Sequence, residues 1–260
     1  MVKPDRARPS RSGVRTNGVA GESLMSSPGQ TTTMRRRSFR WRFEYDTDLP
    51  PTLVEAMWSD PDHVLESGSI FRAGDRSTIA AVTLAGVDGI LKRSHTRGLG
   101  HAVRHALQRS RARRSWEYAR RVAHAGLLTP RPLAILEARR GPWRRVSYLM
   151  TERIHSGVAL HKWVAEHSGP SGAIEGIARQ FGCVWRILGE ARLTHGDMKA
   201  ANLLVDPSGM IWLVDLDGMR HHSTSLGWSR ARERDRRRFL RNWQEFPAVM
   251  STFQNHLDRD

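Results

Sequence analysis

Five polar residues at fixed spacing could do chemistry together. They lie in the segment 193–205 and directly after a later apolar run, and they are His195, Asp197, Lys199, Asn202 and Asp215. A carboxylate in such a segment can accept the proton of a hydroxyl, and an amide with a second carboxylate can hold magnesium on nucleotide phosphates. Phosphoryl transfer needs positioning and charge neutralisation more than covalent chemistry, and hard oxygen ligands suit magnesium. The pattern therefore predicts phosphoryl transfer from a nucleotide to a hydroxyl.

The elements that must position these residues form the second half of the chain. Apolar periodicity predicts helices over 159–166 and 173–190. Residues 201–205 and 210–214 then have the composition of two strands, and the turn 206–209 joins them. The polar residues accordingly flank a predicted hairpin.

The first half of the chain has a mixed pattern. The runs 77–84 and 89–92 surround the turn 85–88, which predicts a hairpin. A basic stretch with apolar residues from Val103 to Val122 at helical spacing predicts a helix, and Gly126 is its predicted C-cap. Two further strands are expected at 132–136 and 146–150, around a turn at 139–142.

At the H-x-D-x-K-x-x-N segment and the later aspartate, the chain resembles the protein-kinase-like superfamily, and most closely the Kdo/WaaP-type lipopolysaccharide kinases. The resemblance covers residues 64–245. It implies an α+β, bilobal protein-kinase-like fold with a β-rich amino-terminal lobe and a helical, reduced carboxy-terminal lobe. The expected parts are a basic disordered tail over 1–38, an amino-terminal lobe over 39–150 and a carboxy-terminal lobe over 151–260.

The resemblance also implies roles for the residues of the catalytic loop. Asp197 is expected to be the catalytic base, His195 to brace the loop, and Lys199 to contact the γ-phosphate of ATP. Asn202 and Asp215 are expected to be the Mg²⁺ ligands. Asp217 stays open as an alternative to Asp215, because neither residue lies in a D-F-G arrangement.

In the first half, the resemblance implies the nucleotide-binding parts. Lys92 corresponds to the strand lysine that bridges the α- and β-phosphates, and Glu117 to the helix glutamate that pairs with it. A local salt bridge from Glu117 to an arginine of its own helix is the alternative. The segment 148–152, which ends at Glu152, resembles the hinge strand whose backbone would meet adenine. Gly74 lies where a phosphate-covering loop belongs, although one glycine is a weak signal.

The charge of the chain restricts the classes of partner. The sequence has 42 Lys and Arg against 26 Asp and Glu, a formal net charge of +16. The arginines between residues 35 and 43 alternate with aromatic residues, as in an interfacial anchor, so peripheral contact with an anionic inner-membrane surface is expected. No recognised nucleic-acid motif accompanies the charge. No apolar run approaches the roughly 18 residues that a spanning helix needs. The single cysteine, Cys183, fits a reducing compartment, and a cytoplasmic location is expected.

The nature of the acceptor is inferred from the end of the chain. Only 42 of the 260 residues follow Gly218, and they contain no A-P-E-like segment, which disfavours a protein substrate. The arginine-rich stretch 230–243 resembles the closing helix of lipopolysaccharide kinases, which implies a lipid-linked sugar, Kdo or heptose, as acceptor. One alternative is a small-molecule phosphotransferase of the aminoglycoside or choline kind, although Lys199 argues against it. The other is a catalytically silent kinase-like scaffold.

Overall fold

The computed structural model describes residues 32–74, 77–95, 109–140, 143–167 and 172–258. The strands are β1 (Thr33–Arg37), β2 (Trp41–Asp46), β3 (Ser69–Ala73), β4 (Ser77–Leu84), β5 (Val87–His95), β6 (Pro132–Arg140), β7 (Trp143–Glu152), β8 (Val158–Ala159), β9 (Leu193–Thr194), β10 (Leu203–Val205), β11 (Ile211–Leu213) and β12 (Arg220–His221). The helices are α1 (Pro51–Ser59), α2 (Pro61–Glu66), α4 (Arg111–His124), α5 (Leu160–Glu166), α6 (Ala173–Glu190), α7 (Ser225–Leu240) and α8 (Pro247–Leu257), with 3₁₀ segments at Ala200–Asn202, Leu216–Gly218 and Arg241–Trp243.

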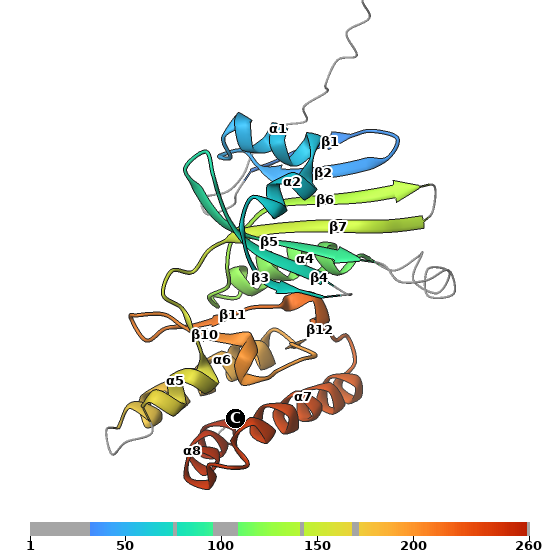
Figure 1. Cartoon of the computed structure of the whole chain (residues 1–260). Coiled ribbons are helices and arrows are strands. Elements are labelled where there is room, and N and C mark those ends of the chain that lie inside the picture. Colours follow the sequence, from blue (N-terminus) through green and yellow to red (C-terminus); the bar gives the residue numbers. More distant parts are fainter. Residues whose placement is uncertain (1–31, 75–76, 96–108, 141–142, 168–171, 259–260) are drawn as a thin grey trace, which may run out of the picture.

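An antiparallel sheet forms the amino-terminal lobe (Figure 1). Its strand order is β1-β2-β6-β7-β5-β4-β3. Helices α1 and α2 bury Leu53, Met57 and Leu65 against one face of the sheet, in a cluster with Phe43 and Leu91. The β4–β5 hairpin turns at Ala85–Gly86 and carries Lys92 opposite Ile79. The sheet thereby holds Lys92 on a strand that has neighbours on both sides.

The carboxy-terminal lobe is mainly helical and lies below the sheet in the view of Figure 1. Its core packs α6 against α7 and α8 through stacked and edge-on aromatic rings of Phe181, Phe239, Trp243 and Phe253. The short strands β10 and β11 form a hairpin that pairs with β8. Strand β12 pairs with β9, so the chain after Gly218 returns to the strand that leads into residues 195–202.

Helix α4 belongs to the cores of both lobes. Its Trp116 packs against Ile135 and Leu149 on the face of the sheet away from α1 and α2, whereas its Val122 is part of the carboxy-terminal core. The helix starts at Ser110, whose hydroxyl accepts a hydrogen bond from the N–H of the third following residue at 2.9 Å. It ends in a Schellman motif at Gly126, where φ is +82°.

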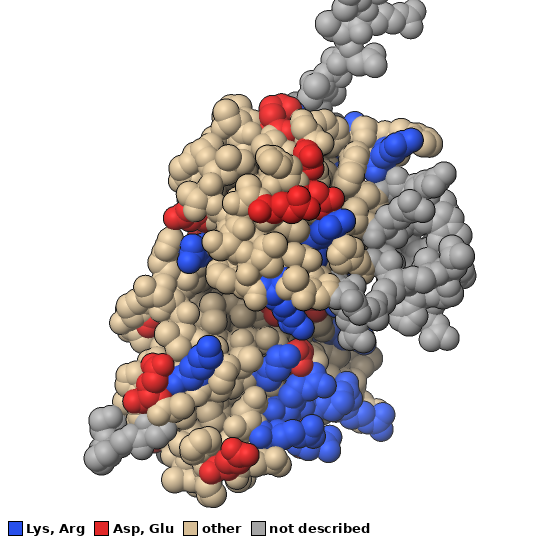
Figure 2. All heavy atoms as spheres, viewed as in Figure 1, with Lys and Arg blue, Asp and Glu red and all other residues tan. Residues whose placement is uncertain are grey.

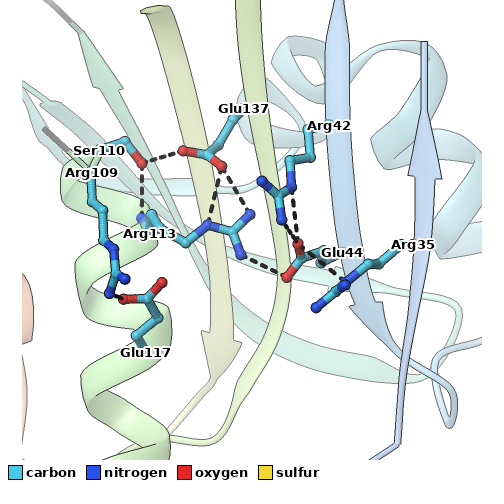
Figure 3. A network of polar contacts seen from close by, with 8 residues as sticks. All are labelled: Arg35, Arg42, Glu44, Arg109, Ser110, Arg113, Glu117 and Glu137. Carbon is cyan, nitrogen blue, oxygen red and sulfur yellow. Dashed lines mark hydrogen bonds and ion pairs between the residues drawn. The ribbon is translucent and has the colours of Figure 1, made fainter. Parts of the chain in front are cut away.

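A buried network of charges fixes α4 to the sheet (Figure 3). The guanidinium of Arg113 donates to Glu44 of β2 at 2.6 Å and to Glu137 of β6 at 2.9 and 3.1 Å. Ser110 donates to the other oxygen of Glu137, and Arg42 donates to Glu44. Burial alone would raise the pKa of Glu44. The charges of Arg113, Arg42 and Arg35 lower it by more than burial raises it, so the net shift is downward. The helix position is therefore set by ionised groups.

The fold agrees with most of the predicted elements. Helix α6 has the predicted bounds, and the hairpins β4–β5, β6–β7 and β10–β11 lie where the sequence placed them. The predicted tail over 1–38 is wrong at its end, because residues 33–37 form β1, which pairs along its length with β2. Residues 1–31 and the predicted start of the basic helix at Val103 lie outside the described residues.

Three helices were not predicted, namely α1, α2 and α8. Each of them begins with a proline at its first position, so the proline that signals a break also supplies a helix start. Cys183 is exposed on α6. None of the described helices is long and apolar enough to cross a bilayer.

Candidate active site

The expected catalytic loop, residues 195–202, starts at a fully buried histidine. His195 follows β9, and its Nε2 lies 3.0 Å from the carbonyl oxygen of Val214, the residue before Asp215. Burial lowers the pKa of His195, and the nearby Asp235 only partly offsets that effect, so the ring is neutral at pH 7. A neutral ring whose Nε2–H donates to Val214 ties the catalytic loop to the segment that carries Asp215.

The next residue can only be a glycine. Gly196 has φ +79°, and a Cβ at this position would collide with the carbonyl oxygen of Gly218. A Cβ at Gly218 would in turn lie 3.1 Å from the carbonyl oxygen of His195. The catalytic loop and the 3₁₀ segment after Asp215 therefore touch backbone to backbone.

The side chain of Asp197 lies among donors. Lys199 Nζ lies 2.9 Å from Oδ2, and Asn202 Nδ2 donates to the same oxygen at 3.1 Å and to the Asp197 carbonyl at 2.9 Å. Arg238 Nη1 lies 3.2 Å from Oδ1. Burial raises the pKa of Asp197, but the hydrogen bonds and charges of Lys199, Asn202 and Arg238 lower it more, so the net shift is downward. The carboxylate is therefore ionised at neutral pH and can accept a proton.

Two residues of α7 hold the loop in place, and the sequence motifs indicate neither of them individually. Asp235 is 3% exposed, and both of its carboxylate oxygens accept from the N–H of Gly196, at 3.0 and 3.1 Å. Arg238 donates to the Gly196 carbonyl at 2.5 Å. The sequence does contain a signal for Asp235, because it lies four residues after Ala231 and four before Phe239, on the buried face of α7. A carboxylate on an apolar helix face needs a partner.

Lys92 of the sheet reaches the segment after β11. Its Nζ lies 2.5 Å from Asp215 Oδ1 and 3.5 Å from Asp217 Oδ2, across 123 residues of sequence in the first case. Asp215 is in the left-handed region, with φ +60° and ψ +52°. Burial raises the pKa of Asp215, but the charge and hydrogen bond of Lys92 lower it more. One lysine therefore faces two carboxylates.

The predicted pairing of Lys92 with Glu117 is wrong. Glu117 lies on α4 and forms its ion pair with Arg109, just before the helix (Figure 3). This is a local salt bridge, as in the alternative interpretation, but with an arginine outside the helix. Arg109 lies just before the first turn of α4 and reaches Glu117. Lys92 faces Asp215 instead.

The oxygen donors around Lys92 fit a magnesium ion. Asp215 and Asp217 both face Lys92, and the Nη1 of the exposed Arg111 lies 4.0 Å from Asp217 Oδ2. Asn202 is buried and its amide nitrogen donates to Asp197, so its amide oxygen is the atom that could coordinate a metal ion. Carboxylate and amide oxygens are the ligands that magnesium prefers. The described residues contain no cluster of three His, Cys, Asp or Glu side chains suited to a metal.

Two predicted cofactor residues lie at the edges of the lobe. Glu152 ends β7, and its carboxylate accepts from the N–H of Arg131 at 2.8 Å. Strand β7 lies between β5 and β6, so the predicted hinge strand is paired on both sides, and the chain leaves the sheet only after Glu152. Gly74 follows β3, and a Cβ there would meet Ser77 O at 3.8 Å, so its described surroundings do not require a glycine.

Comparison with known proteins gives matches of two kinds in sequence. A family model described as the lipopolysaccharide kinase (Kdo/WaaP) family matches residues 55–255. The 3-deoxy-D-manno-octulosonic acid kinase of Xylella fastidiosa (strain M12) is 30% identical over 143 residues, which are 55% of this chain and 51% of that protein. The protein of the same name from Xanthomonas euvesicatoria pv. vesicatoria (strain 85-10) is 31% identical over 136 residues, 52% and 50% of the two chains. The match spans about half the length of these curated relatives.

A solved structure shares the fold. The structure titled "WaaP in complex with acyl carrier protein" superposes with a TM-score of 0.59 at 17% identity and covers 80% of this chain and 86% of that one. At this identity the likeness shows the fold alone. It confirms the predicted α+β, bilobal, protein-kinase-like fold, and the family match confirms the resemblance noted in the sequence.

Proposed function

Because the chain belongs to the lipopolysaccharide kinase (Kdo/WaaP) family, we propose that it transfers the γ-phosphate of ATP to a sugar hydroxyl of the lipopolysaccharide inner core. The observation that carries the proposal is the meeting of Lys92 from one lobe with Asp215 from the other, next to the loop that holds Asp197. The aligned relatives are named as kinases of 3-deoxy-D-manno-octulosonic acid, which makes this sugar acid the first acceptor to test and heptose the second.

The residues of the site have complementary tasks in this reaction. Asp197, ionised and partly exposed, accepts the proton of the acceptor hydroxyl. Lys92 offsets the charge of the nucleotide phosphates, and Lys199, 2.9 Å from Asp197, is close enough to contact the transferred phosphate beside the base. Magnesium held by Asn202 and Asp215 would neutralise further phosphate charge. His195 and α7 hold the base and the expected metal ligands in fixed positions relative to one another.

Contact with a membrane surface is part of the proposal. The tip of the β1–β2 hairpin presents Phe39, which is 92% exposed, between the exposed Arg37 and Arg40. An exposed aromatic ring flanked by cations suits the interface of an anionic bilayer. A lipid-linked acceptor would be met at that surface.

The test is transfer of labelled phosphate from ATP, with magnesium, to purified deep-core lipopolysaccharide. We expect the wild type to label the lipid and Asp197→Asn to lower kcat by roughly 10²–10⁴-fold, the usual contribution of a general base, with little change in ATP binding. Asp48→Asn makes the same change on a carboxylate that is 75% exposed and outside the site, and it should keep full activity.

Each other outcome identifies the part of the proposal that is wrong. Equal labelling by wild type and Asp197→Asn would remove Asp197 from the reaction. ATP hydrolysis without labelling of the lipid would mean a different acceptor, and small alcohols and aminoglycosides would then be tested. A wild type that binds lipopolysaccharide and turns over no ATP would be a scaffold.

A further inference from the structure

A row of arginines runs along the exposed face of α7. Arg230, Arg234 and Arg238 follow at intervals of four residues on one side of α7. Arg241 comes three residues later, at the start of the 3₁₀ segment that continues the helix. We call these four residues the arginine row. All of them are exposed, whereas Ala231, Asp235 and Phe239 on the neighbouring face are buried. Figure 2 shows Lys and Arg gathered over the place where Figure 1 draws α7.

The members of the row differ in their partners. Arg238 is bound to Asp197 and to the Gly196 carbonyl, as described above. Arg230, Arg234 and Arg241 have no carboxylate partner within the described part of the chain. By contrast, the nearby Arg237 is 3.3 Å from Glu233. Three exposed guanidinium groups are therefore available to a ligand on the helix that holds the catalytic loop.

The row extends directly from the catalytic base. Arg238 touches Asp197, Arg234 precedes it by one helical turn, and Arg241 follows it by about one turn, a rise of roughly 5 Å in each direction. Strand β12 adds the exposed Arg220 and His221 beside β9. A molecule whose hydroxyl meets Asp197 therefore lies beside Arg238 and about one helical turn from Arg234 and Arg241.

The positive charge of Arg234 also reaches a neighbouring histidine. The pKa of His222, which lies 2.8 Å from Thr194 of β9, is lowered first by burial and then by the charges of Arg220, His221 and Arg234. Asp235 opposes this effect, but both of its oxygens are used on Gly196. Like charges four residues apart destabilise a helix. The row therefore costs stability when no anion is bound.

We propose that Arg230, Arg234 and Arg241 bind anionic groups of the sugar acceptor and so present its hydroxyl to Asp197. The groups bound are the oxygens of a carboxylate or of a phosphate that the acceptor already carries. Guanidinium groups bind such oxyanions in a bidentate manner, with more geometric specificity than a lysine. The inference rests on the proposed function and deepens it, since the relatives are named for a sugar acid. These arginines are binding residues, and they take no part in the proton transfer.

The test uses the triple variant Arg230→Gln, Arg234→Gln, Arg241→Gln and a delipidated, water-soluble inner-core oligosaccharide as acceptor. We expect KM for the acceptor to rise by about tenfold or more, because three charge-assisted hydrogen-bonding groups are lost, although water screens each of them. KM for ATP should stay as in the wild type. The melting temperature should be unchanged or higher, because the repulsion between the arginines is removed.

Chemical changes to the acceptor separate the two sources of charge. Esterification of the carboxylates and enzymatic removal of phosphates are applied in separate arms. The arm that raises the wild-type KM to that of the triple variant identifies the group bound. Arg179→Gln, an exposed arginine on α6, is the matched control and should leave KM unchanged.

The outcomes that overturn the inference are distinct from failure of the proposed function. An unchanged acceptor KM in the triple variant would overturn it. So would a KM that the triple substitution raises by the same factor for charged and for fully neutralised acceptors. An effect seen only with lipid-bearing acceptor in membranes would assign the row to the bilayer instead. If the wild type transfers no phosphate, the proposed function fails, and calorimetric binding of the oligosaccharide to wild type and triple variant decides the inference by itself.

Discussion

Asp197 combines two requirements that oppose each other. The cations Lys199 and Arg238 lie beside its two oxygens, which keeps the carboxylate ionised and fixes its direction. The same cations lower its pKa and so weaken it in its proposed role as the base. Both side chains are 43–48% exposed, so water screens much of their charge. The site therefore gains positioning at a modest loss of basicity.

The contact between Gly196 and Gly218 gives a prediction for a single methyl group. Gly196→Ala must adopt positive φ and also displace the Gly218 backbone, so we expect a loss of about 2–4 kcal/mol in the free energy of unfolding, together with loss of transfer activity. Urea denaturation and the labelling assay measure both effects.

Gly209→Ala is the control for Gly196→Ala. Gly209 has φ +81°, but a Cβ there would have no atom within 4 Å. This change should cost only the roughly 1–2 kcal/mol of a left-handed alanine and leave activity intact. If both variants lose the same free energy of unfolding, the collision with Gly218 contributes nothing to the loss in Gly196→Ala.

At the scale of elements, the position of α4 depends on the network around Arg113. Glu44→Gln removes one carboxylate from a guanidinium that is 8% exposed, and Glu137 remains as its partner. We expect a loss of about 1.5–3 kcal/mol at pH 7, because the buried Arg113 keeps Glu137 but loses its charge-assisted hydrogen bond to Glu44. Glu190→Gln breaks an exposed pair with Arg186 and should change stability by no more than about 0.5 kcal/mol.

The pH dependence of this loss has a defined sign. The pKa of Glu44 is below its ordinary value of 4.5 in the folded protein, so its contribution is complete above that value and is lost as the pH falls through the lowered folded pKa. The difference between wild type and Glu44→Gln should be constant from pH 7 to about 5 and shrink in more acidic solution. A difference that grows on acidification would contradict an ionised Glu44.

The sequence predicted those elements whose pattern is local. The period of apolar residues located α6, and turn residues located the β4–β5 and β10–β11 hairpins. The helices α1, α2 and α8 were missed because their first residue is proline, which terminates a helix except at this one position. For α2, Asp60 accepts from the N–H of His63, so a capping aspartate before proline was a usable signal.

The site divides in the same way. The segment from His195 to Asn202 and the aspartate at 215 are local patterns, and the structure links them through the contact of His195 with the Val214 carbonyl. Partners from distant segments could not be inferred, because they depend on packing. Glu117 binds Arg109 instead of Lys92, and Arg238 reaches Asp197 from a helix whose many arginines look alike in sequence.

At the scale of the whole molecule, the proposed membrane contact predicts selective binding to anionic vesicles. The exposed Phe39 and its arginines lie at the tip of a hairpin, clear of the core. Wild type should sediment with phosphatidylglycerol vesicles and much less with phosphatidylcholine vesicles, because each cation near an anionic surface contributes about 1 kcal/mol.

Phe39→Ser is the variant for that measurement. It should weaken vesicle binding several-fold and leave the melting temperature unchanged, since the ring is 92% exposed. Activity on delipidated acceptor should also be unaffected. Equal binding of wild type and Phe39→Ser would place the membrane contact elsewhere.

Because α4 belongs to the cores of both lobes, it determines how the protein unfolds. Trp116 packs on the sheet, Val122 lies in the helical lobe, and the hydroxyl of Tyr118 accepts from the N–H of His221 at 2.9 Å. Neither lobe can melt and leave this helix in place. A fragment cut after β7 would expose the apolar face that normally meets the other lobe. The two lobes are thus one cooperative unit, and heating should give a single calorimetric transition.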